Sequence, residues 1–401
     1  MRVQIVDPAA YTPPYDHALA GGLARAGAEV ELVTSQFPYG PVPDQDQTGG
    51  PSDPPRVALS RTLASAGPPR TYGVRELFYR RASRPGLGAG RRRLLRAVEH
   101  VPDMRRYRRV AEQADLVHYQ WLPVPTLDRR LLPPKRPRVF TMHWRLPESG
   151  TRIARTLTAL LAEMDAVVVH SRHGARRLQA DFGVPDERLR VIPHGAFDYL
   201  TRLADEAPLP EELRRLEGPV ILAFGLIRDY KGTDVLLEAF AEVEGAELWI
   251  VGMPRMPMER LRELARRAPG PVRFVDRFIP DREVPAYMRR ADLVVLPYRN
   301  IEQSGVLYTA LAFGRPLVLS SVGGFPEIAE AGAARLVPPG DPEALAAVLR
   351  ELLADDDARD ALAAAAAREA SSTYSWDRIA AATMGLYREL LGSPPPLGDR
   401  S

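Results

Sequence analysis

The chain of 401 residues contains no cysteine, which excludes disulfides, thiolate metal ligands and a cysteine nucleophile. It has no apolar run near the roughly 20 residues that a membrane-spanning helix needs, and its N-terminus lacks a signal-peptide core. Lysine is nearly absent: Lys135 and Lys231 are the only two, although Lys and Arg together number 54. These absences favour a cytoplasmic protein that is soluble or attached peripherally at the inner face of the membrane.

The overall charge and size set further limits. A formal net charge of +3 is too small to indicate a nucleic-acid-binding protein. A hydrophobic content of 45% is ordinary for a globular chain, and 401 residues exceed what a single core usually organises. Two domains are therefore expected.

Short apolar runs alternate with helical patterns along both halves of the chain, which predicts two doubly wound α/β domains with parallel sheets. The polar, acidic stretch at 198–218 marks the boundary. We expect an N-terminal Rossmann-like domain at 1–197 and a C-terminal Rossmann-like domain at 198–375. A final helix at 376–391 would cross back to the N-terminal domain, and a disordered tail at 392–401 would follow. Residues 38–110 are expected to form a loop and basic insertion within the first domain.

Within that insertion, residues 38–70 are rich in Pro, Gly, Asp and Ser and predict a long mobile loop. Residues 75–109, from Arg75 to Arg109, hold twelve arginines against three acidic residues. Leu77, Phe78 and later apolar residues interleave with the arginines, as in amphipathic helices with a basic face. Such a face would attract anionic lipid head groups or an anionic acceptor, or it is a solvated helix face; these interpretations stay open.

A loop near the middle of the chain predicts a phosphate site. Residues 219–224 are continuously apolar, as in a buried parallel strand, and a helical pattern begins at 233. The loop between them carries Gly225, Arg228 and Lys231 at the carboxyl edge of the sheet, where open α/β folds bind ligands. Two cations beside a helix N-terminus would suit a phosphate.

Two further loops are expected at the same edge. In one, Glu302 precedes Gly305, whose lack of a side chain would let backbone N–H groups approach a phosphate. The other loop contains Gly324 and Glu327. The residues predicted to contact the ligand are Gly225, Gln303, Ser304, Gly305, Val306, Leu307, Gly324 and Glu327. No metal site is predicted, because the histidines lack metal-ligand spacing.

Taken in order, these motifs resemble the retaining glycosyltransferases of family four, which have the GT-B fold. The resemblance rests on four stretches of the sequence: Gly225 with Lys231-Gly232, Glu302-x-x-Gly305 before a helix that closes on Gly314-Arg315-Pro316, Val322 to Glu327, and Leu336 to Asp341. It implies two Rossmann-like domains that face each other across a cleft. The first would bind an acceptor and the second a nucleotide-sugar, and no metal or other cofactor would be needed.

The resemblance also implies roles for individual residues. Arg228 and Lys231 would neutralise the leaving diphosphate, Glu302 would anchor hydroxyl groups of the donor sugar, and His143 would line the cleft near that sugar. The sequence departs from the family pattern at two of the donor positions. Leu226 stands where an arginine usually follows the glycine, and Ala310 replaces the second glutamate.

The acceptor side departs as well, because Pro13-Pro14-Tyr15-Asp16-His17 replaces the usual Gly-Gly loop. The acceptor could be lipid-linked, a polysaccharide or a small molecule. Two other functions remain open: a nucleotide-sugar hydrolase or epimerase of the same fold, and a non-catalytic nucleotide-sugar-binding protein.

Overall fold

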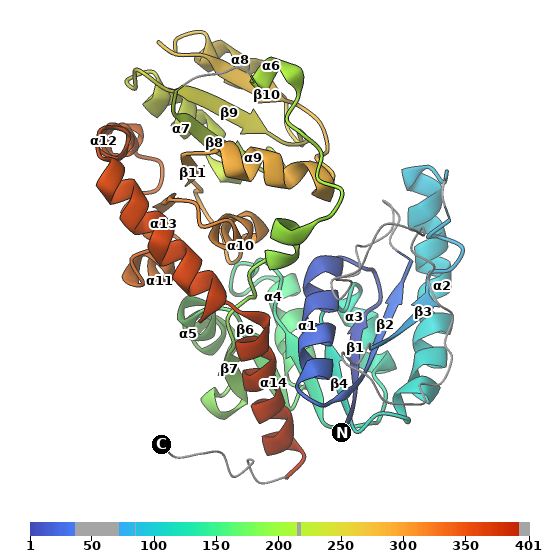
Figure 1. The fold of residues 1–401 in the computed structure, drawn as a ribbon. Helices are drawn as coiled ribbons and strands as arrows, with labels where there is room; N and C mark the ends of the chain where they lie inside the picture. Colours follow the sequence, from blue (N-terminus) through green and yellow to red (C-terminus); the bar gives the residue numbers. More distant parts are fainter. Residues whose placement is uncertain (37–71, 85, 215–217, 393–401) are drawn as a thin grey trace, which may run out of the picture. The chain divides into compact units, whose positions relative to one another are not determined.

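The computed structural model describes residues 1–36, 72–84, 86–214 and 218–392. The chain divides into two compact units (Figure 1). Unit 1 comprises Met1–Pro193 and Trp376–Ser401, and unit 2 comprises His194–Ser375. The loop predicted at 38–70 and the tail predicted beyond Gly392 lie outside the described residues.

Unit 1 is built on a seven-stranded sheet in the order β3-β2-β1-β4-β5-β6-β7, with every neighbouring pair parallel. Strands β4 and β6 are buried along their whole length and β1 is buried from Val3 to Asp7, as expected for a parallel sheet covered on both faces. The strands are β1 (Arg2–Asp7), β2 (Glu29–Ser35), β3 (Gly73–Phe78), β4 (Leu116–Tyr119), β5 (Arg138–Thr141), β6 (Ala166–Val169) and β7 (Leu189–Val191).

Helices cover both faces of this sheet. They are α1 (Pro13–Arg25), α2 (Ala89–Ala111), α3 (Pro125–Leu131), α4 (Arg152–Leu161), α5 (Arg172–Phe182) and α14 (Trp376–Leu390), with a 3-10 turn η1 (Asp186–Arg188). The C-terminal helix α14 packs directly on α1. A Cβ built on Gly22 of α1 would lie 3.1 Å from the Ala380 Cβ and from the Trp376 carbonyl oxygen, so the two backbones approach closely.

The amphipathic helix expected around Leu77 and Phe78 is wrong, because these residues end strand β3. The strand pairs in parallel with β2 at the edge of the sheet, from Glu31 opposite Gly73 onward. Pairing with an existing edge outweighs the helical spacing of a short segment, since it satisfies backbone groups that a lone helix end leaves open. The basic helix begins later, as α2.

Unit 2 contains a six-stranded parallel sheet in the order β10-β9-β8-β11-β12-β13. Its strands are β8 (Val220–Phe224), β9 (Glu247–Val251), β10 (Val272–Val275), β11 (Leu293–Leu296), β12 (Leu317–Ser320) and β13 (Ala334–Val337). Its α-helices are α6 (Glu211–Arg214), α7 (Thr233–Phe240), α8 (Glu259–Ala265), α9 (Val284–Arg290), α10 (Gly305–Ala312), α11 (Phe325–Glu330), α12 (Pro342–Ala354) and α13 (Asp356–Ser371). Three 3-10 turns complete it: η2 (Asp198–Arg202), η3 (Asp229–Lys231) and η4 (Asp281–Glu283).

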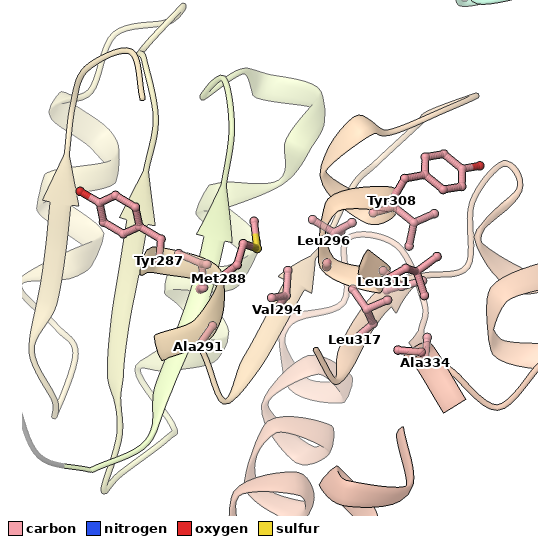
Figure 2. Close-up of a cluster of buried hydrophobic side chains, with 14 of the residues drawn as sticks. Tyr287, Met288, Ala291, Val294, Leu296, Tyr308, Leu311, Leu317 and Ala334 are labelled. Atoms are coloured by element: carbon pink, nitrogen blue, oxygen red, sulfur yellow. The ribbon is translucent and has the colours of Figure 1, made fainter. Parts of the chain in front are cut away.

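One of the hydrophobic clusters of unit 2 fixes the position of α10. Tyr308 and Leu311 of this helix lie against Leu296 of β11 and Leu317 of β12 in a continuous apolar layer (Figure 2). These side chains are at most 3% exposed. The N-terminus of α10 is therefore held rigidly at the edge of the sheet.

The two parallel sheets confirm the predicted fold class of two doubly wound, Rossmann-like domains. In each sheet the strand order reverses beside the first strand of the unit, between β1 and β4 and between β8 and β11. Open α/β sheets bind ligands at the carboxyl end of such a reversal. The loops after these four strands are therefore the expected ligand-binding positions.

Candidate functional site

The loop after β8, residues 225–232, lies alongside the loop after β9 and is hydrogen-bonded to it. Ile227 forms a parallel bridge with Pro254, and its N–H donates to the Met253 carbonyl at 3.1 Å. Gly225 has φ +96° and Gly232 has φ +65°, both in the region that favours glycine. The loop continues through η3 into α7. Lys231 directly precedes Gly232, which is the N-cap residue of α7.

This loop is locked to the loop after β11, residues 297–304. A Cβ built on Gly232 would lie 2.0 Å from the Pro297 carbonyl oxygen, so the two backbones touch where glycine stands. The Arg299 N–H donates to the Tyr230 carbonyl at 2.8 Å. The two loops on either side of the strand-order reversal therefore behave as one piece of structure.

A charged pair reinforces the same junction. The Arg299 guanidinium donates to both oxygens of Asp234 at 2.9 and 2.8 Å, and to the Asp229 carbonyl at 2.9 Å. Partial burial alone would raise the pKa of Asp234, but hydrogen bonds and charge from Arg299 lower it below its usual value. Such a two-pronged contact fixes both position and orientation.

The Lys231 ammonium group is held over this junction. Its Nζ lies 5.2 Å from the centroid of the Tyr298 ring, and 3.0 Å from where a Cβ on Gly225 would stand. Attraction to the aromatic face keeps the cation in place while its side chain stays partly exposed. Arg228, the other predicted cation, stands exposed before η3. Its role as a phosphate ligand remains a prediction.

The N-terminus of α10 closes the other side of this position. A Cβ on Gly225 would lie 2.9 Å from Val306 Cγ2, so the first turn of α10 lies beside the glycine of the first loop. Gly305 is exposed at the first position of the helix. Backbone N–H groups at a helix start favour an anion, and a lysine on the opposite side would complete such a site.

Some of the predicted donor contacts have side chains that are engaged within the protein. Ser304 is buried, and its hydroxyl lies 3.3 Å from that of Tyr298. The Gln303 Oε1 accepts a hydrogen bond from the Tyr308 hydroxyl at 2.6 Å, and Leu307 is part of the apolar core. Contact of these residues with a ligand remains a prediction, and the Leu307 N–H donates to the Ser304 carbonyl at 3.1 Å. Glu302 lies half-buried before them.

The loop after β12, residues 321–324, joins the same group. A Cβ built on Gly323, which has φ +56°, would lie 2.1 Å from the Ile301 carbonyl oxygen. The Phe325 ring lies 5.5 Å from that of Tyr298. Gly324 precedes α11, and Glu327 stands in the first turn of that helix.

Tyr298 links these three loops and was not among the predicted site residues. It is 2% exposed and contacts Lys231, Ser304 and Phe325. Its only sequence signal is an aromatic residue two positions after a buried strand. Ala310, which replaces the second glutamate of the family pattern, is fully buried in the core of unit 2. No carboxylate therefore reaches a ligand from this position.

The predicted residue of unit 1, His143, lies in an aromatic cluster at the carboxyl edge of that sheet. Its Nε2 is 2.9 Å from the Gln120 Oε1, and its ring makes an edge contact with Tyr15 at 4.7 Å. Trp121 is nearly parallel to it at 5.7 Å. His143 is half-buried, so the cluster orients the ring while leaving part of it accessible.

The buried histidines behind this cluster stay uncharged. Burial and the nearby His170 lower the pKa of His118 to about 3, and burial lowers the pKa of His170 to about 4. The His118 Nδ1 is 2.6 Å from the Tyr387 hydroxyl, and the His170 Nδ1 is 2.9 Å from the Ile192 carbonyl oxygen. These side chains support the fold of unit 1.

Among the described residues, no group of three or more His, Asp or Glu side chains is arranged to hold a metal ion. In the same part of the chain, no helix is both long and apolar enough to cross a bilayer.

Two family models match the chain. Residues 15–196 match the model described as Glycosyltransferase Family 4, and residues 218–355 match Glycosyl transferases group 1. Between them the matches cover most of both units.

The chain is also similar to curated proteins named D-inositol 3-phosphate glycosyltransferase. It is 32% identical to the one from Xylanimonas cellulosilytica over 243 residues, which are 57% of this chain and 58% of that protein. It is 33% identical to the one from Corynebacterium jeikeium over 256 residues, 59% of each chain. The chain thus spans a little under three fifths of the length of these relatives.

Solved structures share the fold at low sequence identity. A sucrose-phosphate synthase from Thermosynechococcus elongatus superposes with a TM-score of 0.66 at 21% identity, covering 98% of this chain and 99% of that one. The Anabaena protein HepE in complex with UDP gives 0.66 at 16% identity, covering 97% and 100%.

Proposed function

Because the chain belongs to the group 1 glycosyltransferases of family four, we propose that it transfers a glycosyl group from a nucleotide-sugar to an acceptor with retention of configuration. Unit 2 binds the donor and unit 1 binds the acceptor. The observation that carries this proposal is the Lys231 ammonium, held between Gly225 and the Tyr298 ring beside the start of α10.

This arrangement suits a leaving diphosphate. When the bond to the anomeric carbon breaks, negative charge grows on the phosphate oxygen that leaves. A fixed cation and backbone N–H groups of α10 stabilise that charge more than they stabilise the bound donor, which lowers the barrier. Arg228 adds a second positive charge from its exposed position. The rigid junction of Arg299 with Asp234 keeps the loop in place, so little reorganisation is needed during the reaction.

Glu302 and Glu327 contact sugar hydroxyls of the donor in this proposal, and Gly324 lets the backbone approach the ligand. In unit 1, His143 contacts the sugar that is transferred. No metal or other cofactor takes part. The solved structures of HepE include complexes with UDP and with UDP-glucose, which makes UDP the first nucleotide to test.

The donor proposal is tested by binding and then by turnover. We expect nucleoside diphosphates, UDP first, to raise the melting temperature of the protein, since a ligand that binds only the folded state stabilises it. At a concentration 100 times Kd the gain is about 2.7 kcal/mol. Nucleosides without phosphate should give a much smaller shift. The absence of any shift across UDP, GDP, ADP and TDP would contradict the proposal.

Turnover separates the transferase from the alternatives. Radiolabelled nucleotide-sugars are incubated with the protein and a membrane or polysaccharide extract. Transfer requires label in a product that forms only with the extract. Free sugar or an isomerised donor formed without the extract would identify a hydrolase or epimerase. Tight nucleotide binding with no product of any kind would identify a non-catalytic binding protein.

We also propose that α2 docks unit 1 on an anionic membrane surface. Leu94 and Val98 stand one helical turn apart, and their side chains are 66% and 63% exposed. Two large apolar side chains that face water on the same side of a helix are unusual in a soluble protein. Arg91 and Arg105 share this face by helical spacing, and both are exposed. An apolar strip bordered by arginines is the pattern of an interfacial helix.

Liposome sedimentation tests this docking. We expect the protein to bind vesicles rich in phosphatidylserine or phosphatidylglycerol, and binding to neutral vesicles should be weak. Added salt should weaken the anionic binding because it screens the arginines. Reversing Arg91 and Arg105 to Glu should reduce it by at least about 25-fold, from roughly 1 kcal/mol for each lost positive charge.

A matched control removes an equally exposed apolar residue elsewhere. Ile153 of α4 is 67% exposed, so Ile153→Ser should leave vesicle binding unchanged while the double variant Leu94→Ser, Val98→Ser reduces it. The membrane proposal would be contradicted if both variants bound vesicles equally, or if binding did not depend on lipid charge. The solvated helix face would then be the correct interpretation of α2.

A further inference from the structure

We propose that unit 1 takes an acceptor with an uncharged, hydroxyl-bearing ring, such as a pyranose, which stacks on an aromatic platform formed by Tyr11 and Trp121. The loop after β1, residues 8–12, would hold no acceptor phosphate. This inference rests on the proposed function, because it names the class of acceptor that the transfer uses.

The first support is that the backbone donors of this loop are already used. The N–H groups of Ala9, Tyr11 and Thr12 donate to the Asp7 carboxylate at 3.1, 2.6 and 3.2 Å. The Ala10 N–H donates to the Asp7 carbonyl at 3.3 Å. Asp7 is fully buried, so a carboxylate of the protein itself occupies the place where a loop of this kind would receive an anion.

The start of α1 also offers few backbone N–H donors to a ligand. Its first two residues are Pro13 and Pro14, which have no N–H, and the Asp16 N–H donates to the Thr12 carbonyl at 3.0 Å. Pro8 also lacks a donor. Of the nine positions from 8 to 16, three are therefore prolines and five have N–H groups that donate within the loop.

Charge acts in the same direction. Asp16 is buried beside Asp7, and burial together with the Asp7 charge raises the pKa of Asp16 well above its usual value. Burial also raises the pKa of Asp7, and the hydrogen bonds from its three N–H donors lower it. An acceptor phosphate would lie beside two buried carboxyl groups, with three N–H groups of the loop already donating to one of them.

The second support is the platform itself. Tyr11 is 51% exposed, and its ring makes an edge contact with Trp121 at 5.0 Å and 79°. The Trp121 Nε1 donates to the Thr12 hydroxyl at 2.8 Å, which fixes the indole plane. Trp144 adds a third ring 6.2 Å from Trp121. Such rings offer contact area to the C–H face of a neutral ring at the edge where these sheets bind ligands.

Saturation-transfer NMR with the full chain and paired probes tests the inference. The neutral probes are glucose, methyl β-glucopyranoside, phenyl β-glucopyranoside and myo-inositol, and the charged ones are glucose 6-phosphate and myo-inositol 1-phosphate. We expect saturation of the ring protons of at least one neutral probe, with each phosphate binding no tighter than its parent. Comparing the methyl and phenyl glucosides separates a sugar from an aromatic ring as the group that stacks.

Variants assign the signal to the platform. Tyr11→Ala and Trp121→Phe should each weaken neutral-ring binding at least fivefold. Trp121→Phe retains an apolar ring and loses the hydrogen bond to Thr12. Phe278→Ala is the control, because Phe278 is an aromatic residue of unit 2 with nearly the same exposure, 54%. Unchanged binding in both platform variants overturns the inference.

A phosphorylated probe that binds tenfold tighter than its parent also overturns it. Arg145, which is exposed beside Trp144, is the cation to test in that case, through Arg145→Ala. UDP thermal shifts measured on the same variants keep the two proposals apart. If the platform variants bind both UDP and the neutral probes as the wild type does, only the platform is refuted. If the wild type binds no nucleotide but binds neutral probes that the platform variants lose, only the donor proposal is refuted.

Discussion

Lys231→Met is expected to reduce the rate of glycosyl transfer by about 10²–10³-fold, the usual cost of removing one group that stabilises charge in the transition state. Methionine keeps an unbranched apolar side chain and removes the ammonium, whose Nζ lies over the Tyr298 ring. The loss should appear mainly in kcat, since the charge on the leaving phosphate grows as the bond breaks. Steady-state kinetics with a labelled nucleotide-sugar would measure it.

The sequence provides a matched control for this variant, because Lys135 is the only other lysine. Lys135→Met makes the same chemical change in unit 1 and should leave kcat unchanged. Circular dichroism should show both variants folded. A Lys231→Met enzyme that retains at least half of the wild-type rate would refute the role of the ammonium, and the α10 backbone N–H groups would then be the remaining candidates.

Gly232→Ala is expected to lower the free energy of unfolding of unit 2 by roughly 2–5 kcal/mol. The left-handed conformation costs a residue with a Cβ about 1–2 kcal/mol, and overpacking adds about 1–3. The overpacking arises because the new methyl group would stand 2.0 Å from the Pro297 carbonyl oxygen. Urea titration followed by circular dichroism would measure the loss.

Gly245→Ala separates the two contributions. Gly245 has φ +74°, close to that of Gly232, but a Cβ there meets no atom within 4 Å. It should cost only the conformational term. Hydrogen exchange of the peptides spanning 219–240 would place the effect of Gly232→Ala in the loop after β8. Equal losses for the two variants would mean that contact between the loops contributes nothing to stability.

The buried strands were the most predictable part of the fold. Residues 219–224 were predicted as a buried parallel strand, and β8 spans Val220–Phe224 in the interior of its sheet. The edge strands were harder. β3 carries Arg75 and Glu76, and β13 exposes Arg335 and Leu336, so neither shows the continuous apolar run of a central strand.

The candidate site was predictable as a set of loops, since glycines and cations after buried strands are visible in the sequence. The contacts that hold those loops together were not. Arg299 pairs with Asp234, which lies 65 positions away along the chain, and Tyr298 acquires its role only when three loops meet. The side-chain partners of Gln303 and Ser304 were not visible in the sequence either: both bond to tyrosines of unit 2, and their contact with a ligand stays a prediction.

The place of Lys231 over Tyr298 gives this protein a built-in spectroscopic reporter. Reductive methylation with ¹³C-formaldehyde would label only two side chains, Lys135 and Lys231, together with the amino terminus. With its Nζ 5.2 Å from the ring centroid, the Lys231 signal should be displaced by the ring current of Tyr298, which distinguishes it from that of Lys135. Nucleotide binding could then be followed at the very atom proposed to meet the phosphate.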